Sequence, residues 1–197
     1  MGDADVAVVN TCTVTASADA DARNWIRRAR RENPHVRLLV TGCYAQRAPE
    51  ELAELPGVEW VVGNSHKPEI ASILEKEAVP AIVPSQFVSL ESLQRPNADV
   101  ADATDVASDL DRRTKILVGD VAELRSVLVA PVFGSSEDRT RPTLKIQDGC
   151  NQRCAYCVIP SVRGRSRSLS MGEALAQVQR LDDGYQEVVL SGVDLGA

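Results

Sequence analysis

Short apolar runs and longer helix-like segments alternate along the first 77 residues. The apolar runs, each typical of a buried parallel strand, lie at residues 6–10, 36–40 and 58–62. The segments with helical composition and spacing lie at residues 16–33, 49–55 and 67–77. This alternation predicts a parallel α/β sheet with right-handed crossovers, which we interpret as an incomplete flavodoxin-like sheet.

The alternation weakens between residues 79 and 139. Ala and Asp are frequent there, which predicts a solvated and partly disordered linker or insertion. Two apolar triplets inside it, residues 116–118 and 127–129, predict short strands. The acidic positions are Asp99, Asp102, Asp105, Asp109 and Asp111.

From residue 140 the pattern predicts a single β-α-β unit. Its strand, helix and second strand are expected at residues 143–147, 170–182 and 187–191. Ser170 is the predicted N-cap of the helix, with Glu173 at capping-box spacing, and Gly184 suits the stop. The predicted domain boundaries are therefore 1–78, 79–139 and 140–197.

Composition restricts the possible partners and the compartment. The chain has 197 residues, 44% of them apolar, 4% aromatic, and a net charge of −6, which disfavours a polyanionic partner unless basic groups are locally concentrated. No run approaches the roughly 20 apolar residues of a membrane span. The acidic start lacks a basic signal-peptide region, so the five cysteines indicate the reducing cytoplasm.

Three of the cysteines form one short loop motif. Cys150, Cys154 and Cys157 follow the spacing Cys-x3-Cys-x2-Cys. Three thiolates can hold three irons of a [4Fe–4S] cluster and leave the fourth iron open to a small molecule. Structural zinc needs a fourth ligand, which is absent nearby, whereas catalytic zinc with a water remains an alternative. The spacing favours the open-iron cluster.

The other two cysteines each follow a predicted strand. Cys12 comes after the first apolar run and Cys43 after the second. Ligand sites in open α/β sheets gather at the carboxyl ends of strands, so both thiols are expected at one edge. Two unrelated buried cysteines are the alternative interpretation.

The sequence around all five cysteines resembles the methylthiotransferase branch of the radical S-adenosylmethionine (SAM) enzymes. Among these it is most similar to the tRNA threonylcarbamoyladenosine methylthiotransferases. The similar segments are residues 10–15, 41–47, 144–151, 154–160 and 163–164. The resemblance implies that residues 140–197 are the first β-α-β unit of a radical SAM partial TIM barrel.

The resemblance also implies cofactors and ligands. Cys150, Cys154 and Cys157 would bind the [4Fe–4S] cluster that cleaves SAM to a 5′-deoxyadenosyl radical. Tyr156 would lie near the SAM adenine, and Gly192 would let backbone approach the SAM amino group. Loop packing and a simple turn glycine are the alternatives for these two residues. An electron donor such as flavodoxin or ferredoxin would reduce the cluster.

Cys12 and Cys43 would bind an auxiliary [4Fe–4S] cluster that receives the methylthio group. The implied substrate is tRNA, at carbon 2 of the N6-threonylcarbamoyl-adenosine next to the anticodon. The third auxiliary cysteine of the family pattern is missing, so the chain is interpreted as a fragment, inactive alone. The alternatives are an isopentenyl-adenosine tRNA or ribosomal protein substrate, or a non-catalytic cluster-binding fragment.

Two groups of arginines have open interpretations. The first group surrounds the cysteine loop and could meet tRNA phosphates or the SAM carboxylate, or form a solvated basic loop. It consists of Arg153, Arg163, Arg165 and Arg167. The second group, on the first predicted helix, is interpreted as a solvated face. It consists of Arg27, Arg28, Arg30 and Arg31.

Overall fold

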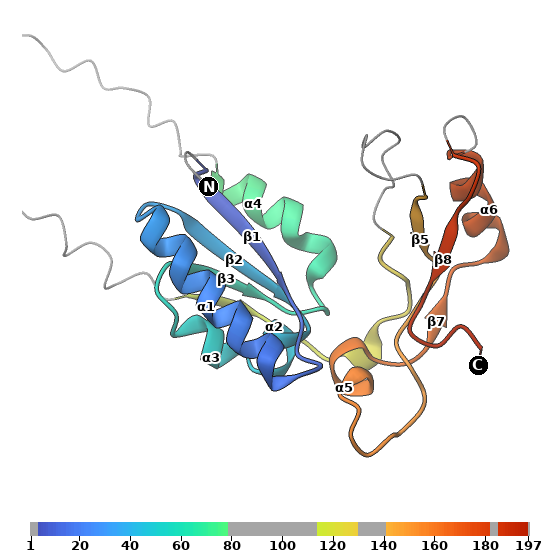
Figure 1. Ribbon diagram of the computed structural model, residues 1–197, viewed down its shortest axis with the longest axis horizontal. Coiled ribbons are helices and arrows are strands. Elements are labelled where there is room, and N and C mark those ends of the chain that lie inside the picture. The colour runs from blue at the N-terminus through green and yellow to red at the C-terminus, as the bar shows by residue number, and fades with distance from the viewer. Residues whose placement is uncertain (1–3, 79–113, 130–140, 182–184, 197) are drawn as a thin grey trace, which may run out of the picture.

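The chain folds into two parts, seen side by side in Figure 1. The computed structural model describes residues 4–78, 114–129, 141–181 and 185–196. The first part holds a four-stranded sheet, and the second holds two small two-stranded sheets. The expected α/β fold is confirmed.

The first sheet is parallel throughout, in the order β1-β2-β3-β4. Its strands are β1 (Val6–Thr11), β2 (Arg37–Gly42), β3 (Val58–Val62) and β4 (Lys115–Leu117). β2 and β3 are almost wholly buried, as continuous apolar runs require in a sheet covered on both faces. The three strands predicted in the first third of the sequence are therefore confirmed.

Helices cover both faces of this sheet. α1 (Ala16–Glu32) and α3 (Pro49–Ala53) pack on one face, where Ile26 and Leu52 meet Leu38 and Val61. The opposite face carries Trp60, on which the apolar side chains of α4 (Ile70–Ala78) pack. A 3-10 turn, η1 (Lys67–Glu69), precedes α4 and begins where the helix was predicted to begin.

The solvated arginine face predicted for α1 agrees with its packing. Thr15 caps the helix by accepting the Ala18 N–H at 3.1 Å. Ile26 and Ala29 point into the core, whereas Arg27, Arg28 and Arg31 are exposed. Arg28 pairs with Glu32 one turn later, and Arg30 reaches the Val36 carbonyl.

The second part contains the predicted β-α-β unit. β5 (Thr143–Lys145) pairs in parallel with β8 (Val189–Ser191), and α6 (Met171–Gln179) connects them. The capping box of Ser170 and Glu173 is present, with both reciprocal hydrogen bonds. The predicted helix stop at Gly184 lies outside the described residues.

Three predicted segments need correction. The strand expected at 143–147 breaks at Ile146, where the chain leaves β8 and forms β6 (Gln147–Asp148), antiparallel to β7 (Arg167–Ser168). The strand expected at 187–191 begins only at Val189. Residues 127–129 form no strand, and the carbonyl of the preceding Ser126 accepts the Arg167 side chain.

The first sheet continues beyond residue 78. β4 overlaps the short strand predicted at residues 116–118, inside the stretch expected as a linker, and it pairs with β3. A 3-10 turn, η3 (Val121–Glu123), follows it and leads toward the second part. The acidic stretch between residues 99 and 111 lies outside the described residues. Part of the expected linker thus belongs to the sheet.

A short helix joins the two parts. α5 (Ile159–Arg163) contacts η3 and the short helix α2 (Cys43–Arg47), neither of which was predicted (Figure 1). Gly164 ends α5 with φ 78°, and a Cβ there would lie 2.2 Å from the Val121 carbonyl oxygen. The close backbone approach therefore requires glycine.

Gly42, the last residue of β2 and the N-cap of α2, generates a stability prediction. Its φ is 103°, and an added Cβ would lie 2.2 Å from the Thr11 carbonyl oxygen. We expect Gly42→Ala to lower the free energy of unfolding by about 3 kcal/mol, measured by urea denaturation. Gly172→Ala is the control, because Gly172 lies in α6 with nothing within 4 Å and alanine favours helix there. Equal unfolding curves for Gly42→Ala and the parent chain would contradict this expectation.

Candidate functional site

Cys12 and Cys43 lie at the same edge of the first sheet. β1 and β2 are in register to their last residues, with Thr11 opposite Gly42, so the two thiols follow neighbouring strand ends. The Thr11 hydroxyl donates to the Thr41 carbonyl at 2.7 Å and ties these ends together. Cys43 is 4% exposed, whereas Cys12 is open to solvent. The sequence-based placement of both thiols is therefore correct.

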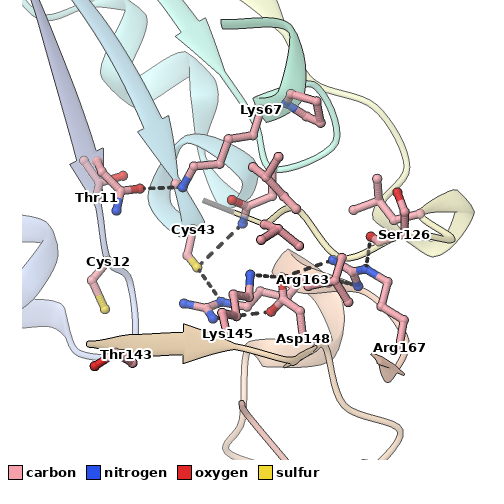
Figure 2. A pocket seen from close by; sticks show the side chains of 18 of the residues that line it. Thr11, Cys12, Cys43, Lys67, Ser126, Thr143, Lys145, Asp148, Arg163 and Arg167 are labelled. Carbon is pink, nitrogen blue, oxygen red and sulfur yellow. Dashed lines mark hydrogen bonds and ion pairs between the residues drawn. The ribbon is translucent and has the colours of Figure 1, made fainter. Parts of the chain in front are cut away.

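These thiols line a pocket between the two parts, shown in Figure 2. The cavity has a volume of about 1110 Å³. Its first wall is the edge of the sheet, and its second is formed by β5, β6, α5 and β7 of the second part. Residues 124 and 126–129 close a third side, so the predicted but absent strand serves as a pocket wall.

The sulfur of Cys43 is held by one residue from each part. Asn64, just beyond β3, donates to Cys43 Sγ at 3.6 Å and to the Val162 carbonyl at 2.8 Å. Arg163 Nε, from α5, donates to the same sulfur at 3.4 Å (Figure 2). The guanidinium gives this sulfur a charged hydrogen-bond donor.

Asp148 gathers the basic groups of the second part. Its carboxylate accepts from Lys145 at 2.7 Å, Arg167 at 3.2 Å and Arg163 at 3.4 Å. Burial acts to raise the pKa of Asp148, but the Lys145 ammonium and the Gly149 N–H outweigh burial and hold the pKa below its usual value. The same balance applies to Arg163. Burial lowers its pKa, and Cys43 and Asp148 together more than reverse this.

Lys67 is the basic group contributed by the first part. It extends from η1 to the end of β1, where its ammonium donates to Asn10 Oδ1 at 2.8 Å. Burial lowers the pKa of Lys67, and the nearby cations Lys145 and Arg163 lower it further. Four cations thus line the pocket, Lys67 from the first part and Lys145, Arg163 and Arg167 from the second.

The cysteine loop begins with a turn that only glycine fits. Gly149 has φ 71°, and a Cβ there would lie 2.1 Å from the Arg165 carbonyl oxygen. The Cys150 N–H donates to the Gly164 carbonyl at 3.2 Å, which closes the loop against the end of α5. The Gln152 N–H donates to Cys150 Sγ at 3.4 Å. Such N–H groups stabilise a thiolate or cluster sulfur.

Gln147 joins this loop to the end of β8. Its side-chain oxygen Oε1 accepts the Val193 and Asp194 N–H groups at 2.7 and 2.9 Å. Its side-chain nitrogen Nε2 donates to the Gly149 carbonyl at 2.8 Å. Gly192 lies against this side chain, where a Cβ would come 2.8 Å from Gln147 Oε1. Close packing on Gln147 therefore accounts for glycine at this position, and a role toward SAM stays a prediction.

The three loop cysteines are free thiols, but the structure does not gather them. Cys150 and Cys157 are half-buried and Cys154 is exposed, and the Cys150 thiol donates to Asp194 at 3.5 Å. Among the described residues, no three Cys, His, Asp or Glu side chains are placed to hold a metal ion. Tyr156 is 92% exposed, so its predicted place beside an adenine stays untested.

The structure adds site residues that were not predicted from sequence. Four of them lie within a strand that ends at the pocket or just beyond one, and the fifth, Lys67, lies in η1. A lysine or glutamine inside an apolar strand is the sequence signal that could have identified two of them. The added residues are Asn64, Lys67, Lys145, Gln147 and Asp148. Of the four loop arginines, Arg163 and Arg167 form internal ion pairs, whereas Arg153 and Arg165 are exposed.

Similarity to known proteins agrees with the two-part architecture. Residues 1–63 match the uncharacterized protein family UPF0004, and residues 144–195 match the radical SAM superfamily. Over 196 residues the chain is 39% identical to the threonylcarbamoyladenosine tRNA methylthiotransferase MtaB of Aquifex aeolicus, covering 98% of this chain and 39% of that protein. The chain belongs to the radical SAM methylthiotransferase family.

Other members of the radical SAM methylthiotransferases show the same partial coverage. The MtaB protein of Bacillus subtilis is 38% identical over 194 residues, which cover 98% of this chain and 36% of that protein. The ribosomal protein uS12 methylthiotransferase RimO of Chloroflexus aurantiacus is 31% identical, covering 95% of this chain and 38% of that protein. The chain thus spans less than two fifths of the length of these relatives.

The donor chemistry of the chain fits the iron–sulfur cluster and SAM that the radical SAM superfamily implies. Three free thiols lie on one short loop with a backbone N–H directed at the first sulfur. Soft thiolates are the ligands that such clusters require.

Over the described residues, none of the helices has the length and apolar character needed to cross a membrane.

The contact of Arg163 with Cys43 generates a prediction about how the two parts dock. Arg163→Gln removes the charged donor shared by Cys43 and Asp148. We expect the free energy of unfolding to fall by about 1–2 kcal/mol, since the group is partly solvated. Urea denaturation measures this change. Arg165→Gln is the matched control, because the Arg165 side chain is exposed, and a loss of equal size in this variant would contradict the assignment.

Proposed function

We propose that this chain provides the radical SAM and sulfur-donor sites of a tRNA methylthiotransferase. The reaction would add a methylthio group to carbon 2 of N6-threonylcarbamoyl-adenosine next to the anticodon. One observation carries the proposal. Cys12 and Cys43 of the UPF0004 part open into a pocket whose other wall belongs to the radical SAM part. The MtaB relatives from Aquifex and Bacillus support the choice of substrate.

Cys150, Cys154 and Cys157 are the proposed ligands of a [4Fe–4S] cluster with one iron open to SAM. When bound, this pair supplies a carbon radical able to remove hydrogen from an unactivated aromatic carbon. Gly149 turns the loop, and the Gln152 N–H at 3.4 Å supports the Cys150 sulfur. Tyr156 is proposed to face the SAM adenine once the loop closes on the ligand.

Cys12 and Cys43 are the proposed ligands of the auxiliary [4Fe–4S] cluster. Arg163 donates to the Cys43 sulfur at 3.4 Å, so it would offset negative charge at this site. A third thiol is required by analogy with the cysteine loop, and the other three cysteines of this sequence are all in that loop. Gly192 keeps the turn after β8 close to Gln147, which in turn bonds the start of the cysteine loop. Gly192 is therefore proposed to let backbone approach the amino group of SAM.

The proposed chemistry also defines partners and location. Each SAM cleavage consumes one electron, so we propose a low-potential donor such as flavodoxin or ferredoxin. Free thiols and reduced clusters need a reducing compartment, which for this protein would be the cytoplasm. The exposed Arg153 and Arg165 beside the loop are available to tRNA phosphates.

A second candidate keeps the site and changes the substrate. The Chloroflexus relative, at 31% identity, is a ribosomal protein uS12 methylthiotransferase, so an aspartate of a ribosomal protein would then replace the tRNA nucleoside. An isopentenyl-adenosine tRNA is the other substrate alternative, and a non-catalytic cluster carrier would use neither. Mass spectrometry of tRNA nucleosides and of ribosomal protein, after incubation with SAM and a reductant, separates these possibilities.

The cluster assignment predicts which cysteine changes remove the response to SAM. We expect Cys150→Ser, in protein reconstituted anaerobically with iron and sulfide, to lose the change in the reduced cluster's EPR spectrum on addition of SAM. Cys12→Ser is the matched control. It should lower bound iron and sulfide but keep the SAM response, because Cys12 lies outside the loop.

Two outcomes would contradict this assignment. One is a colourless protein holding stoichiometric zinc after reconstitution. The other is a SAM response that survives Cys150→Ser and disappears with Cys12→Ser. Formation of 5′-deoxyadenosine from SAM is the independent readout, measured by chromatography.

A further inference from the structure

We propose that Lys67, supported by Lys145 and Arg163, recognises a carboxylate on the substrate inside the pocket between the two parts. The ligand class is a nucleoside that carries a free carboxylate, as the threonylcarbamoyl group does. The inference rests on the proposed function, which it deepens by naming the residues that select the substrate.

The position of Lys67 is the first observation. Its ammonium lines the pocket together with Cys12 and Cys43, and it donates to Asn10 Oδ1 at 2.8 Å. Figure 2 shows the side chain reaching from η1 toward the end of β1, on the Cys43 side of the pocket. An ammonium has three donors, and a neutral amide accepts one of them. Lys67 therefore keeps donors for a ligand.

The charge balance of the pocket is the second observation. Four cationic side chains line the pocket, namely Lys67, Lys145, Arg163 and Arg167. Among the described residues, the carboxylate that lines the pocket is that of Asp148. Asp148 is already shared by Lys145, Arg163 and Arg167 at 2.7 to 3.4 Å. Within the part of the chain that the structure describes, Lys67 has no carboxylate at ion-pair distance. The pocket thus holds surplus positive charge, which an anionic ligand would neutralise.

Hydrogen bonding to the thiols does not explain the position of the Lys67 ammonium. Arg163 already donates to the Cys43 sulfur, whereas the hydrogen bond found for Lys67 goes to an amide oxygen. Of these two cations, Arg163 hydrogen-bonds the Cys43 sulfur, whereas Lys67 lies near that sulfur and interacts with it through charge. The remaining N–H donors of Lys67 are therefore available to a group that enters the pocket beside Cys43.

The apolar part of the pocket lining suits the rest of such a ligand. It is formed by Val127, Leu128, Val129 and Pro142, which line the same pocket as the cations. The volume of about 1110 Å³ admits a nucleoside with a substituent. A base can lie on the apolar wall while its carboxylate reaches Lys67. This arrangement discriminates against an isopentenyl group, which would leave the half-buried ammonium without an anion.

Ligand chemistry provides the first test. The reconstituted chain is titrated calorimetrically with N6-threonylcarbamoyladenosine, with its threoninamide, which lacks only the charge, and with N6-isopentenyladenosine. We expect both neutral nucleosides to bind at least about tenfold more weakly than the acid, or about 1.4 kcal/mol. Equal affinity for acid and amide overturns the proposal, as does no binding of the acid.

Variants of Lys67 provide the second test. Lys67→Met should abolish the preference for the acid over the amide, and Lys67→Arg should retain most of it. Lys76→Met is the matched control, because Lys76 is an exposed lysine on α4 outside the pocket, and it should leave the preference unchanged. If Lys67→Met does not fold, Lys67→Gln takes its place, and an unchanged preference for the acid in Lys67→Gln overturns the role of Lys67.

Two further probes separate a carboxylate site from other anion sites. Adenosine monophosphate and an aspartate-containing peptide are titrated into the parent chain and Lys67→Met. The proposal is overturned if Lys67→Met weakens either probe as much as it weakens the acid. Cleavage of SAM to 5′-deoxyadenosine is measured on the same preparation. Its absence counts against the proposed function, whereas loss of the acid preference alone counts against the role of Lys67.

Discussion

The shared carboxylate of Asp148 is the interaction on which the site depends. It lies at the end of β6, accepts the Gly149 N–H at 2.9 Å, and pairs with Lys145, Arg163 and Arg167 from three different elements. Burial of a carboxylate costs free energy unless the carboxylate is paired. The position of Asp148 therefore fixes the positions of these three cations. Arg163 then carries the connection onward to Cys43 in the other part of the chain.

This connection places the two groups of cysteines on opposite sides of one ion-pair network. The cysteine loop begins two residues after Asp148, and Cys43 lies beyond Arg163. Asn64 reinforces the docking by bonding both Cys43 and the Val162 carbonyl. Hydrogen bonds and charges around thiolates tune the metal affinity and the reduction potential of a metal site. A shift of α5 would therefore change these properties at both proposed clusters.

Predictions from the sequence succeeded where a local pattern decides the structure. β1, β2 and β3 follow from continuous apolar runs, and the capping box of Ser170 and Glu173 follows from spacing alone. They failed where a partner from elsewhere in the chain decides. Residues 127–129 are apolar enough for a strand, but they line the pocket between the two parts instead of pairing with a strand. The break at Ile146 depends on two different neighbours, which no local pattern reveals.

The sequence by itself determined the alternation of strands and helices, the thiols at strand ends and the spacing of the cysteine loop. These features depend on residues close to each other in the chain. Tertiary structure decided which cations face which thiol, because Lys67, Lys145 and Arg163 meet only when the two parts dock. Long-range electrostatics and burial have no periodic signature in a sequence. The charge of the pocket, on which the proposed ligand depends, became visible only in three dimensions.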